Sequence, residues 1–288
     1  MSLPTLADYD PPTELPASRA QWTVVPARAA LLVHDMQRYF LRPYPSDGRA
    51  LDGAVASIAA LLDAARSAGV PVVYTAAVGA AADRGLQNDL WGPGMRAAAE
   101  DTAIVDAVAP RDGETVLTKH RYSAFVRTGL DGWLRERGRD QLVITGVYAH
   151  IGVLATAFDA FCRDVAPFLV ADAVAAFDRA GHERALATAA QSCAVVTTTA
   201  GVRAALAGDA ILRAALGGLL DEPGALRRAL DNPDEDLFAL GLDSIRAMSL
   251  IDALADRGVD VDFGEFIGAG TVGFLRERID AGITPAAG

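Results

Sequence analysis

"QLVITGVYAHIGVLATAFDAFCRDVAPFLVADA", residues 141–173, contains the pattern that decides the fold. It begins with an apolar run, 141–147, continues through a segment with helical spacing, 155–164, and ends in a second apolar run, 167–173. Short runs that are apolar on both faces are typical of strands buried beneath helices. The stretch therefore predicts two parallel strands joined by a helix.

The same kind of run recurs along the first two thirds of the chain. Four more occur, at residues 27–34, 70–76, 115–119 and 193–199. Helical patterns separate most of them, and residues 51–69 end in the glycine that commonly stops a helix. The sequence predicts an α/β fold, a doubly wound parallel sheet. Such a sheet binds ligands at the carboxyl ends of its strands.

The pattern changes after residue 207. From there the sequence predicts three or four short amphipathic helices joined by acidic loops. From Asp221 to Gly288 there are 14 acidic residues and 6 arginines, so this part carries −8 of the net charge of −11. We expect a larger α/β domain over residues 1–207, and a small all-α helix bundle with its own partners over residues 208–288.

Composition excludes several classes of function. A net charge of −11 argues against a nucleic-acid partner, and no long uncharged apolar run predicts a membrane span. The N-terminal sequence has no basic region followed by an apolar core, so we expect a cytoplasmic protein. Cys162 and Cys193 are too few for a disulfide framework and are expected to be buried.

Three predicted strands bring polar residues to one edge of the sheet. Asp35 follows the first strand, Lys119 ends the third, and residues 148–152 follow the fourth. Lys119 is the only lysine beside 25 arginines. Lysine supplies a compact point charge that the planar guanidinium of arginine does not replace. The sequence therefore predicts an Asp35–Lys119 pair at this edge.

The segment "LGLDSIRAMSL", residues 240–250, lies in the acidic helical part. Asp243 and Ser244 before an apolar helix are also what a simple helix N-cap requires. The whole segment nevertheless closely resembles the phosphopantetheine attachment site of acyl, peptidyl and aryl carrier proteins. The resemblance implies that a phosphopantetheinyl transferase attaches 4'-phosphopantetheine to Ser244. Met248 and Ile245 are candidates for an apolar contact patch, although core packing is the favoured interpretation for Ile245.

Several long motifs of the larger domain occur in the order of a known family. "LLVHDMQRYF" (31–40), "NDLWGPGM" (88–95), "VLTKHRYSAF" (116–125) and residues 145–177 resemble the isochorismatases. An isochorismatase joined to an aryl carrier domain resembles the bifunctional proteins of catechol siderophore assembly. The resemblance implies hydrolysis of the vinyl ether of isochorismate, which gives 2,3-dihydro-2,3-dihydroxybenzoate and pyruvate.

The superfamily of the isochorismatases includes cysteine amidohydrolases that use an Asp, a Lys and a Cys. Asp35 and Lys119 match the first two, and the cysteine position falls on Gly152. Because glycine has no nucleophile, covalent amide hydrolysis is disfavoured. The resemblance implies that Asp35 is the general acid, which protonates the enolpyruvyl methylene carbon before water attacks.

Further substrate contacts follow from the resemblance. Arg84 would hold a carboxylate, and Tyr148 would contact the ring or a carboxylate, although they also suit a loop charge and a core tyrosine. Gln37 would orient Asp35 or its water, or cap the strand-end turn. Ala77 stands where the family has a glutamine that contacts substrate.

The alanine at position 77 leaves three possibilities open: the substrate is isochorismate, it is 2-amino-2-deoxyisochorismate, or the domain is an inactive scaffold for the carrier. Histidines flank the motifs without ligand spacing, so no metal is expected. The expected macromolecular partners are a transferase, an aryl-acid adenylation enzyme and a condensation domain, whose basic patches an acidic surface suits. The family also implies a homodimer.

Overall fold

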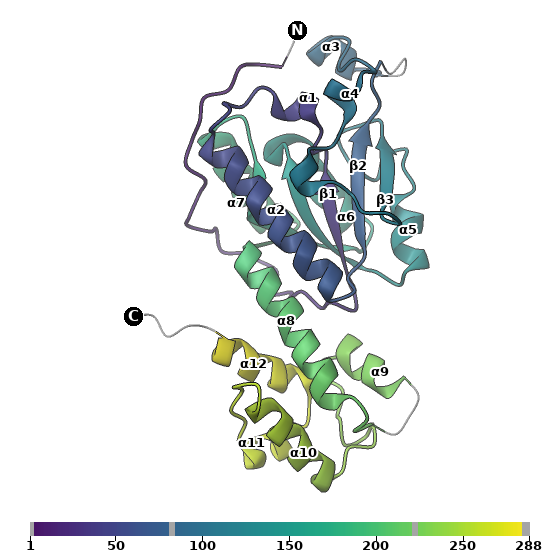
Figure 1. Ribbon diagram of the computed structural model, residues 1–288, viewed down its shortest axis with the longest axis vertical. Coiled ribbons are helices and arrows are strands. Elements are labelled where there is room, and N and C mark those ends of the chain that lie inside the picture. The colour runs from purple at the N-terminus through teal and green to yellow at the C-terminus, as the bar shows by residue number, and fades with distance from the viewer. Residues whose placement is uncertain (1–2, 81–83, 221–223, 284–288) are drawn as a thin grey trace. The chain divides into compact units, whose positions relative to one another are not determined.

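The computed structural model describes residues 3–80, 84–220 and 224–283 (Figure 1). Its centre is a six-stranded parallel sheet in the order β3-β2-β1-β4-β5-β6. The strands are β1 (Ala29–His34), β2 (Val72–Ala77), β3 (Thr115–Lys119), β4 (Gln141–Val147), β5 (Ala166–Ala175) and β6 (Val195–Thr197). Each predicted run overlaps one of these strands, so the predicted α/β class is confirmed.

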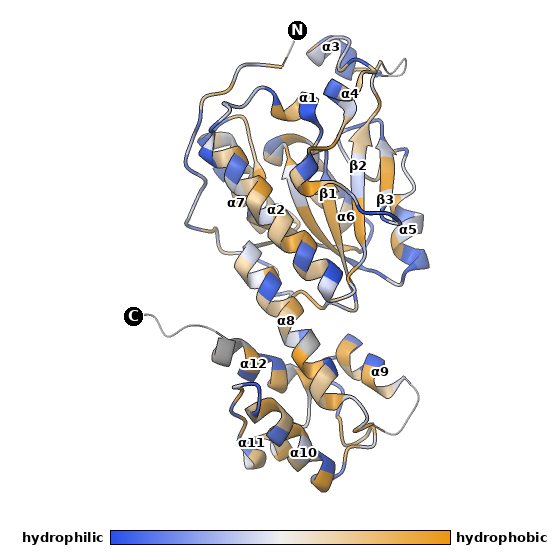
Figure 2. Cartoon of the chain, in the orientation of Figure 1, coloured by the Kyte–Doolittle hydropathy of each residue, from blue (hydrophilic) through white to orange (hydrophobic). Residues whose placement is uncertain are grey.

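Helices cover both faces of this sheet. Helix α2 (Arg49–Ser67) lies in front of it in Figure 1 and contacts β5 most extensively. Residues of α5 (Leu130–Glu136), α6 (Leu154–Phe161) and α7 (Arg179–Ser192) share a second apolar core with the strands. Figure 2 shows that hydrophobic residues dominate the central strands, whereas polar residues alternate along α2. The mostly buried strands explain why their sequences are apolar on both faces.

Short elements complete this part of the chain. They lie mainly in the connections that follow β1, β2 and β4, close to the edge where the strands end. They are α1 (Arg38–Leu41), α3 (Gln87–Trp91), α4 (Ala99–Thr102), η1 (Asp106–Val108) and η2 (Ala149–Val153).

The remaining helices form a separate bundle core. They are α8 (Thr199–Leu216), α9 (Ala225–Asp231), α10 (Ser244–Ala255), α11 (Phe263–Ala269) and α12 (Val272–Ile283). Leucines from α8, α9, α10 and α12 share this core with Phe266 of α11. These helices confirm the all-α class that the sequence predicts for the C-terminal part of the chain.

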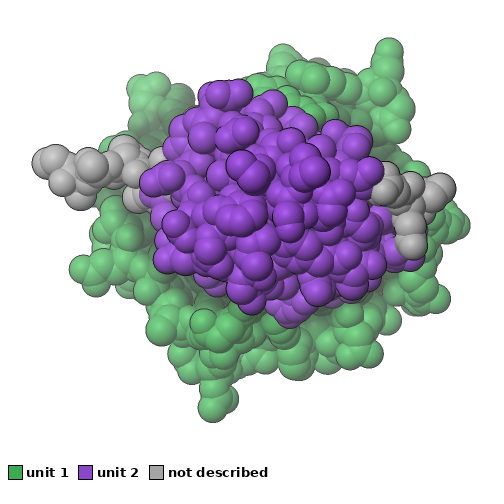
Figure 3. Space-filling model, turned by 90° about the horizontal axis from the view of Figure 1, so that it is seen from below, with its two compact units in different colours: residues 1–23, 29–199 green, residues 24–28, 200–288 purple. Residues whose placement is uncertain are grey.

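The chain divides into two compact units, coloured separately in Figure 3. One comprises residues 1–23 and 29–199, and the other residues 24–28 and 200–288. The domain limit that the sequence suggests, after residue 207, falls within α8. Each unit has its own apolar core, as expected of two domains.

The two cysteines differ in their surroundings. Cys193 is buried, and burial raises the pKa of its thiol to about 11. Cys162 is exposed, so the prediction that it is buried was wrong. Helix α6 ends at Phe161, and Cys162 follows as its C-cap residue, outside the inward-facing stripe of that helix. Both thiols are free.

No helix within the described ranges is both long and apolar enough to span a membrane.

Candidate active site and carrier serine

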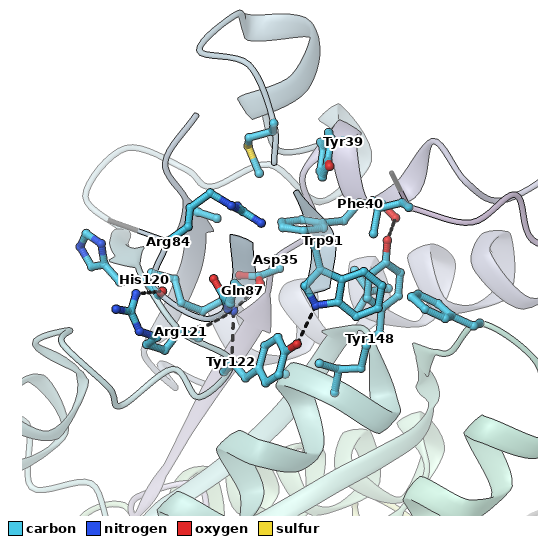
Figure 4. Close-up of a pocket in the computed structure, with 18 residues that line it drawn as sticks. Asp35, Tyr39, Phe40, Arg84, Gln87, Trp91, His120, Arg121, Tyr122 and Tyr148 are labelled. Carbon is cyan, nitrogen blue, oxygen red and sulfur yellow. Dashed lines mark hydrogen bonds and ion pairs between the residues drawn. The ribbon is translucent and has the colours of Figure 1, made fainter. Parts of the chain in front are cut away.

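A cavity opens where the central strands end (Figure 4). It brings together the side chains or backbone of six predicted site residues, namely Asp35, Ala77, Arg84, Lys119, Tyr148 and Gly152. Gln37 does not line it. The rest of the wall is largely aromatic, with contributions from Tyr39, Phe40, Trp91, Tyr122 and Phe177. A polar centre inside an apolar wall is typical of a small-molecule site.

Asp35 lies one residue beyond β1 and is 4% exposed. Its φ of 53° is in the left-handed region, which is unusual for a residue other than glycine. The Asp35 N–H donates to Thr75 O at 3.2 Å, and the Thr75 hydroxyl donates to Asp35 Oδ1 at 2.8 Å. The neighbouring strand β2 therefore holds both the backbone and one carboxylate oxygen of Asp35. Strained residues that their surroundings fix in this way concentrate at functional sites.

Lys119 pairs with the other oxygen of Asp35. Its Nζ lies 2.7 Å from Asp35 Oδ2, and both side chains are almost completely buried. The ammonium also donates to the carbonyl oxygens of Arg121, at 2.8 Å, and Tyr122, at 3.3 Å. These three acceptors use all three N–H donors of a lysine. A planar guanidinium cannot direct its donors in this way, so this position favours lysine over arginine.

His34, the last residue of β1, is a part of the site that sequence reasoning treated only as a flanking residue. It is fully buried, with Nδ1 3.0 Å from Val147 O and 3.6 Å from Asp35 Oδ2. Burial lowers its pKa to about 4, although the charge of Asp35 acts in the opposite direction. The imidazole is therefore neutral at pH 7 and leaves Lys119 as the charged partner of Asp35. The sequence signal that could have identified His34 is its position directly before Asp35, the predicted acid.

Gly152 lies in the π-helical turn η2, directly against His34. A Cβ atom at residue 152 would lie 2.5 Å from His34 Cε1 and 3.1 Å from Tyr122 O. Side-chain atoms do not approach this closely, so the imidazole occupies the space that a side chain at 152 needs. Any nucleophile at this position would require His34 to move.

Tyr148 presents its ring, rather than its hydroxyl, to the cavity. The hydroxyl donates to Phe40 O at 2.6 Å, and the ring packs edge-to-face on Phe177 with centroids 4.6 Å apart. Burial raises the pKa of Tyr148. This geometry suits contact with an apolar ring face more than a hydrogen bond to a carboxylate.

Arg84 also lines the cavity (Figure 4). Its Nε donates to Gly92 O at 3.0 Å, and its guanidinium passes over Gly94, where a Cβ atom would lie 2.1 Å from Arg84 Nη1. Among the described residues, no carboxylate pairs with Arg84. Its Nη groups are therefore placed to bind an anionic ligand.

The side-chain amide of Gln37 is bound by backbone groups of the protein. Its Oε1 accepts from Ala77 N at 2.7 Å, and its Nε2 donates to the carbonyl oxygens of Ala77, at 2.9 Å, and Thr102, at 2.7 Å. With its amide engaged by the backbone and its side chain outside the cavity, Gln37 fixes the end of β2. Ala77 itself lines the cavity, so this point of the wall has no polar side-chain group.

Ser244 is the first residue of α10 and is exposed. Asp243 caps the helix by accepting from Arg246 N at 2.8 Å, while Arg246 Nη1 donates to Gly241 O at 3.2 Å. Within the described ranges, the Ser244 hydroxyl makes no hydrogen bond, so it is available for covalent modification. These residues fit an attached phosphopantetheine, since the helix start also favours a phosphate.

Ile245 is 78% exposed and Met248 58% exposed. The expectation that Ile245 packs in the core was wrong. Helix α10 turns Ala247, Leu250 and Leu254 inward instead, and this places Ile245 on the opposite face beside the serine.

Over residues 3–80, 84–220 and 224–283, no three His, Cys, Asp or Glu residues form a group that could hold a metal ion.

Two families match the chain. Residues 29–201 match the family described as "Isochorismatase domain", and residues 211–279 match "Phosphopantetheine attachment site". "Phenazine biosynthesis protein PhzD" of Pseudomonas fluorescens is 50% identical over 201 residues, which cover 68% of this chain and 96% of that protein. "Enterobactin synthase component B" of Escherichia coli (strain K12) is 42% identical over 271 residues, which cover 91% of this chain and 93% of that protein.

Solved structures show the same fold for the first unit. A cysteine hydrolase from Pseudomonas syringae pv. phaseolicola superimposes with a TM-score of 0.61 at 29% identity, covering 67% of this chain and 97% of that one. The phenazine relative and this structure cover about two thirds of the chain, whereas the enterobactin relative spans nearly all of it.

Proposed function

The chain belongs to the isochorismatase family and carries a phosphopantetheine attachment domain, and from this premise we propose that it hydrolyses the vinyl ether of isochorismate and carries an aryl acid on Ser244. The products of hydrolysis are pyruvate and 2,3-dihydro-2,3-dihydroxybenzoate. The observation that carries the proposal is the buried Asp35–Lys119 pair beside a Gly152 that has no room for a nucleophilic side chain.

The chemistry uses Asp35 as a general acid. Protonated Asp35 delivers its proton to the terminal methylene carbon of the enolpyruvyl group, which leaves an oxocarbenium ion. Water adds to this cation and returns a proton to Asp35. The resulting hemiketal collapses to pyruvate and the ring alcohol. No covalent enzyme intermediate forms, in agreement with the glycine at 152.

Lys119 and Arg84 prepare this step. The substrate carries two carboxylates, and Arg84 has Nη groups available to bind one of them. A carboxylate that approaches Lys119 competes with Asp35 for the ammonium, and this favours the protonated carboxyl group that acid catalysis needs. A rate of pyruvate release that stays flat from about pH 5 to 9 would contradict this coupling.

The second activity belongs to the carrier unit. The thiol of phosphopantetheine, once attached to Ser244, holds the aryl acid as a thioester. Exposed Ile245 and Met248 beside the serine support a contact surface for the enzymes that load and unload the carrier. We propose that these are a phosphopantetheinyl transferase, an aryl-acid adenylation enzyme and a condensation domain, and that the protein is a homodimer.

A second candidate substrate is 2-amino-2-deoxyisochorismate. The 50% identity of the hydrolase unit to a phenazine biosynthesis protein favours it, and Ala77 removes a polar contact that the family resemblance leads one to expect. The same Asp35 chemistry would apply, because the vinyl ether is unchanged.

The test is pyruvate release by the purified protein given isochorismate, its 2-amino analogue and chorismate in parallel. Fast release from isochorismate supports the proposal, and preference for the amino analogue supports the second candidate. Asp35→Asn should abolish release while circular dichroism shows an intact fold. If no substrate yields pyruvate, the hydrolase unit is an inactive scaffold and the proposal fails.

A further inference from the structure

In the segment from Arg84 to Trp91, aliphatic side chains face solvent and polar side chains face the cavity. Leu86 is 81% exposed and Leu90 is 57% exposed, so the large aliphatic side chains of the segment point to solvent. Arg84, Gln87 and Trp91 line the cavity instead. Burial of apolar groups would favour the reverse arrangement. The inward face of this segment is therefore suited to a polar ligand rather than to core packing.

Gln87 is the first residue of α3, and its backbone N–H donates to Arg84 O at 3.2 Å. Its side chain is half-buried and faces the cavity (Figure 4). Over the residues that the structure describes, this side-chain amide makes no hydrogen bond. Gln37 gives the contrast, because the backbone engages both ends of its amide. An amide in a cavity without a protein partner is available to a ligand.

Position 77 lies on the wall formed by β2. Ala77 pairs with Lys119 in the register of β2 and β3, and Gln37 holds both its N–H and its carbonyl. The backbone orientation at 77 is therefore fixed, and a longer side chain there would extend into the cavity. With alanine at this position, β2 offers the ligand only a methyl group. Among the residues that line the cavity, Gln87 is the one carboxamide.

We propose that Gln87 is a specificity-determining residue that contacts the substrate and supplies from α3 the amide that Ala77 lacks on β2. A carboxamide can donate to a carboxylate through Nε2 and accept from a hydroxyl or amino group through Oε1. The ligand class is thus a ring that carries a carboxylate next to a hydroxyl or amino substituent. This inference rests on the proposed function and deepens it.

The experiment measures kcat and KM for pyruvate release from isochorismate and from its 2-amino analogue. Gln87→Ala should lower kcat/KM for the preferred substrate by about tenfold to a hundredfold, since a hydrogen bond to a charged group is lost. Most of the loss should appear in KM. Asn88→Ala, which changes an exposed residue of the same helix outside the cavity, is the matched control and should match the wild type.

The decisive variant moves the carboxamide group from α3, at position 87, to β2, at position 77. Ala77→Gln combined with Gln87→Ala should recover at least tenfold of the kcat/KM that Gln87→Ala alone loses. Ala77→Gln alone should bring no gain, because two amides then compete for one space. A purely structural role of Gln87 predicts no such recovery and a fall in the melting temperature.

The outcomes separate the two proposals. If the wild type releases no pyruvate, the proposed function fails before Gln87 is tested. If the wild type is active and Gln87→Ala leaves KM unchanged for both substrates, the inference about Gln87 is overturned. Loss without recovery in the double variant also overturns it.

Discussion

At the scale of single residues, the site depends on a contact between a buried histidine and a glycine. His34 fills the space beside Gly152, and its Nδ1 lies 3.0 Å from Val147 O. The imidazole thus links the ends of β1 and β4 directly behind Asp35.

Gly152→Ala should therefore damage both stability and activity. The new methyl group would force His34 aside, at a cost of about 1–3 kcal/mol for overpacking. Pyruvate release should fall at least about a hundredfold, because catalytic geometry tolerates little displacement. Urea denaturation and steady-state kinetics measure the two effects. Gly53→Ala is the control, since a Cβ atom at this position near the start of α2 meets nothing within 4 Å. Equal behaviour of the two variants would contradict the contact.

A second buried histidine predicts a pH dependence of stability. The Tyr9 hydroxyl lies 3.1 Å from His182 Nδ1, and His182 Nε2 lies 3.0 Å from Ala171 O. Burial lowers the pKa of His182 to about 4. Between that value and the ordinary value of about 6.5, the unfolded chain binds more protons than the folded chain. Stability is therefore complete above about pH 6.5 and falls as the pH drops toward 4.

The free energy of unfolding should fall by about 2 kcal/mol between pH 7.5 and 5 on account of His182, and His34 adds a similar contribution. Urea titrations followed by tryptophan fluorescence report on the hydrolase unit, which contains Trp22, Trp91 and Trp133. His182→Gln should reduce the slope against pH by up to one proton. An unchanged slope would show that His182 is not the responsible group.

Sequence patterns identified Asp35 and Lys119 because parallel strands bring their carboxyl ends to one edge. They did not identify His34 as a space-filling residue or Gln87 as a cavity residue. Both assignments depend on which face of a short segment turns inward, and tertiary packing decides this. For Ile245, the apolar side chain suggested the core, whereas the helical phase of α10 places it in solvent.

At the scale of elements, the long apolar runs and amphipathic helices were predictable, and the short connections were not. Isolated helices as short as α3 and α4 are not stable without tertiary contacts, so their sequences carry little signal. Helix α4 shows the kind of contact that is needed. Its Asp101 is buried beside Arg42 and Arg96, and the hydrogen bonds from these arginines hold the pKa of Asp101 well below its usual range.

Helix α10 depends on its cap. Asp243 accepts from Arg246 N at 2.8 Å, and Asp243→Ala should destabilise the helix start by about 1 kcal/mol. Hydrogen exchange measured by mass spectrometry should show faster exchange in peptides from α10 and unchanged exchange in β1 and β4. Ser249→Ala is the control, because Ser249 lies in the same helix away from the cap and its exposed hydroxyl donates to Ile245 O. Equal exchange in both variants would argue against the cap.

At the scale of the whole molecule, the hydrolase site and the carrier serine lie in two units, each with its own apolar core. Ser244→Ala should abolish attachment of phosphopantetheine, read as a missing mass increase after incubation with a transferase and coenzyme A. Its rate of pyruvate release should equal that of the wild type. Asp35→Asn should show the opposite pair of results. A Ser244→Ala protein that loses hydrolysis would show that the two activities are coupled.

The order of the strands has a consequence for protein synthesis. The cavity takes its residues from β1 at the centre of the sheet, from β2 and β3 on one side, and from the end of β4 on the other. Every residue of this wall lies before position 178. A ribosome has therefore assembled all the chemical groups of the hydrolase site before it reaches the codon for Ser244. Because domains tend to fold from the N-terminus as they emerge, the enzyme can mature while its carrier is still being translated.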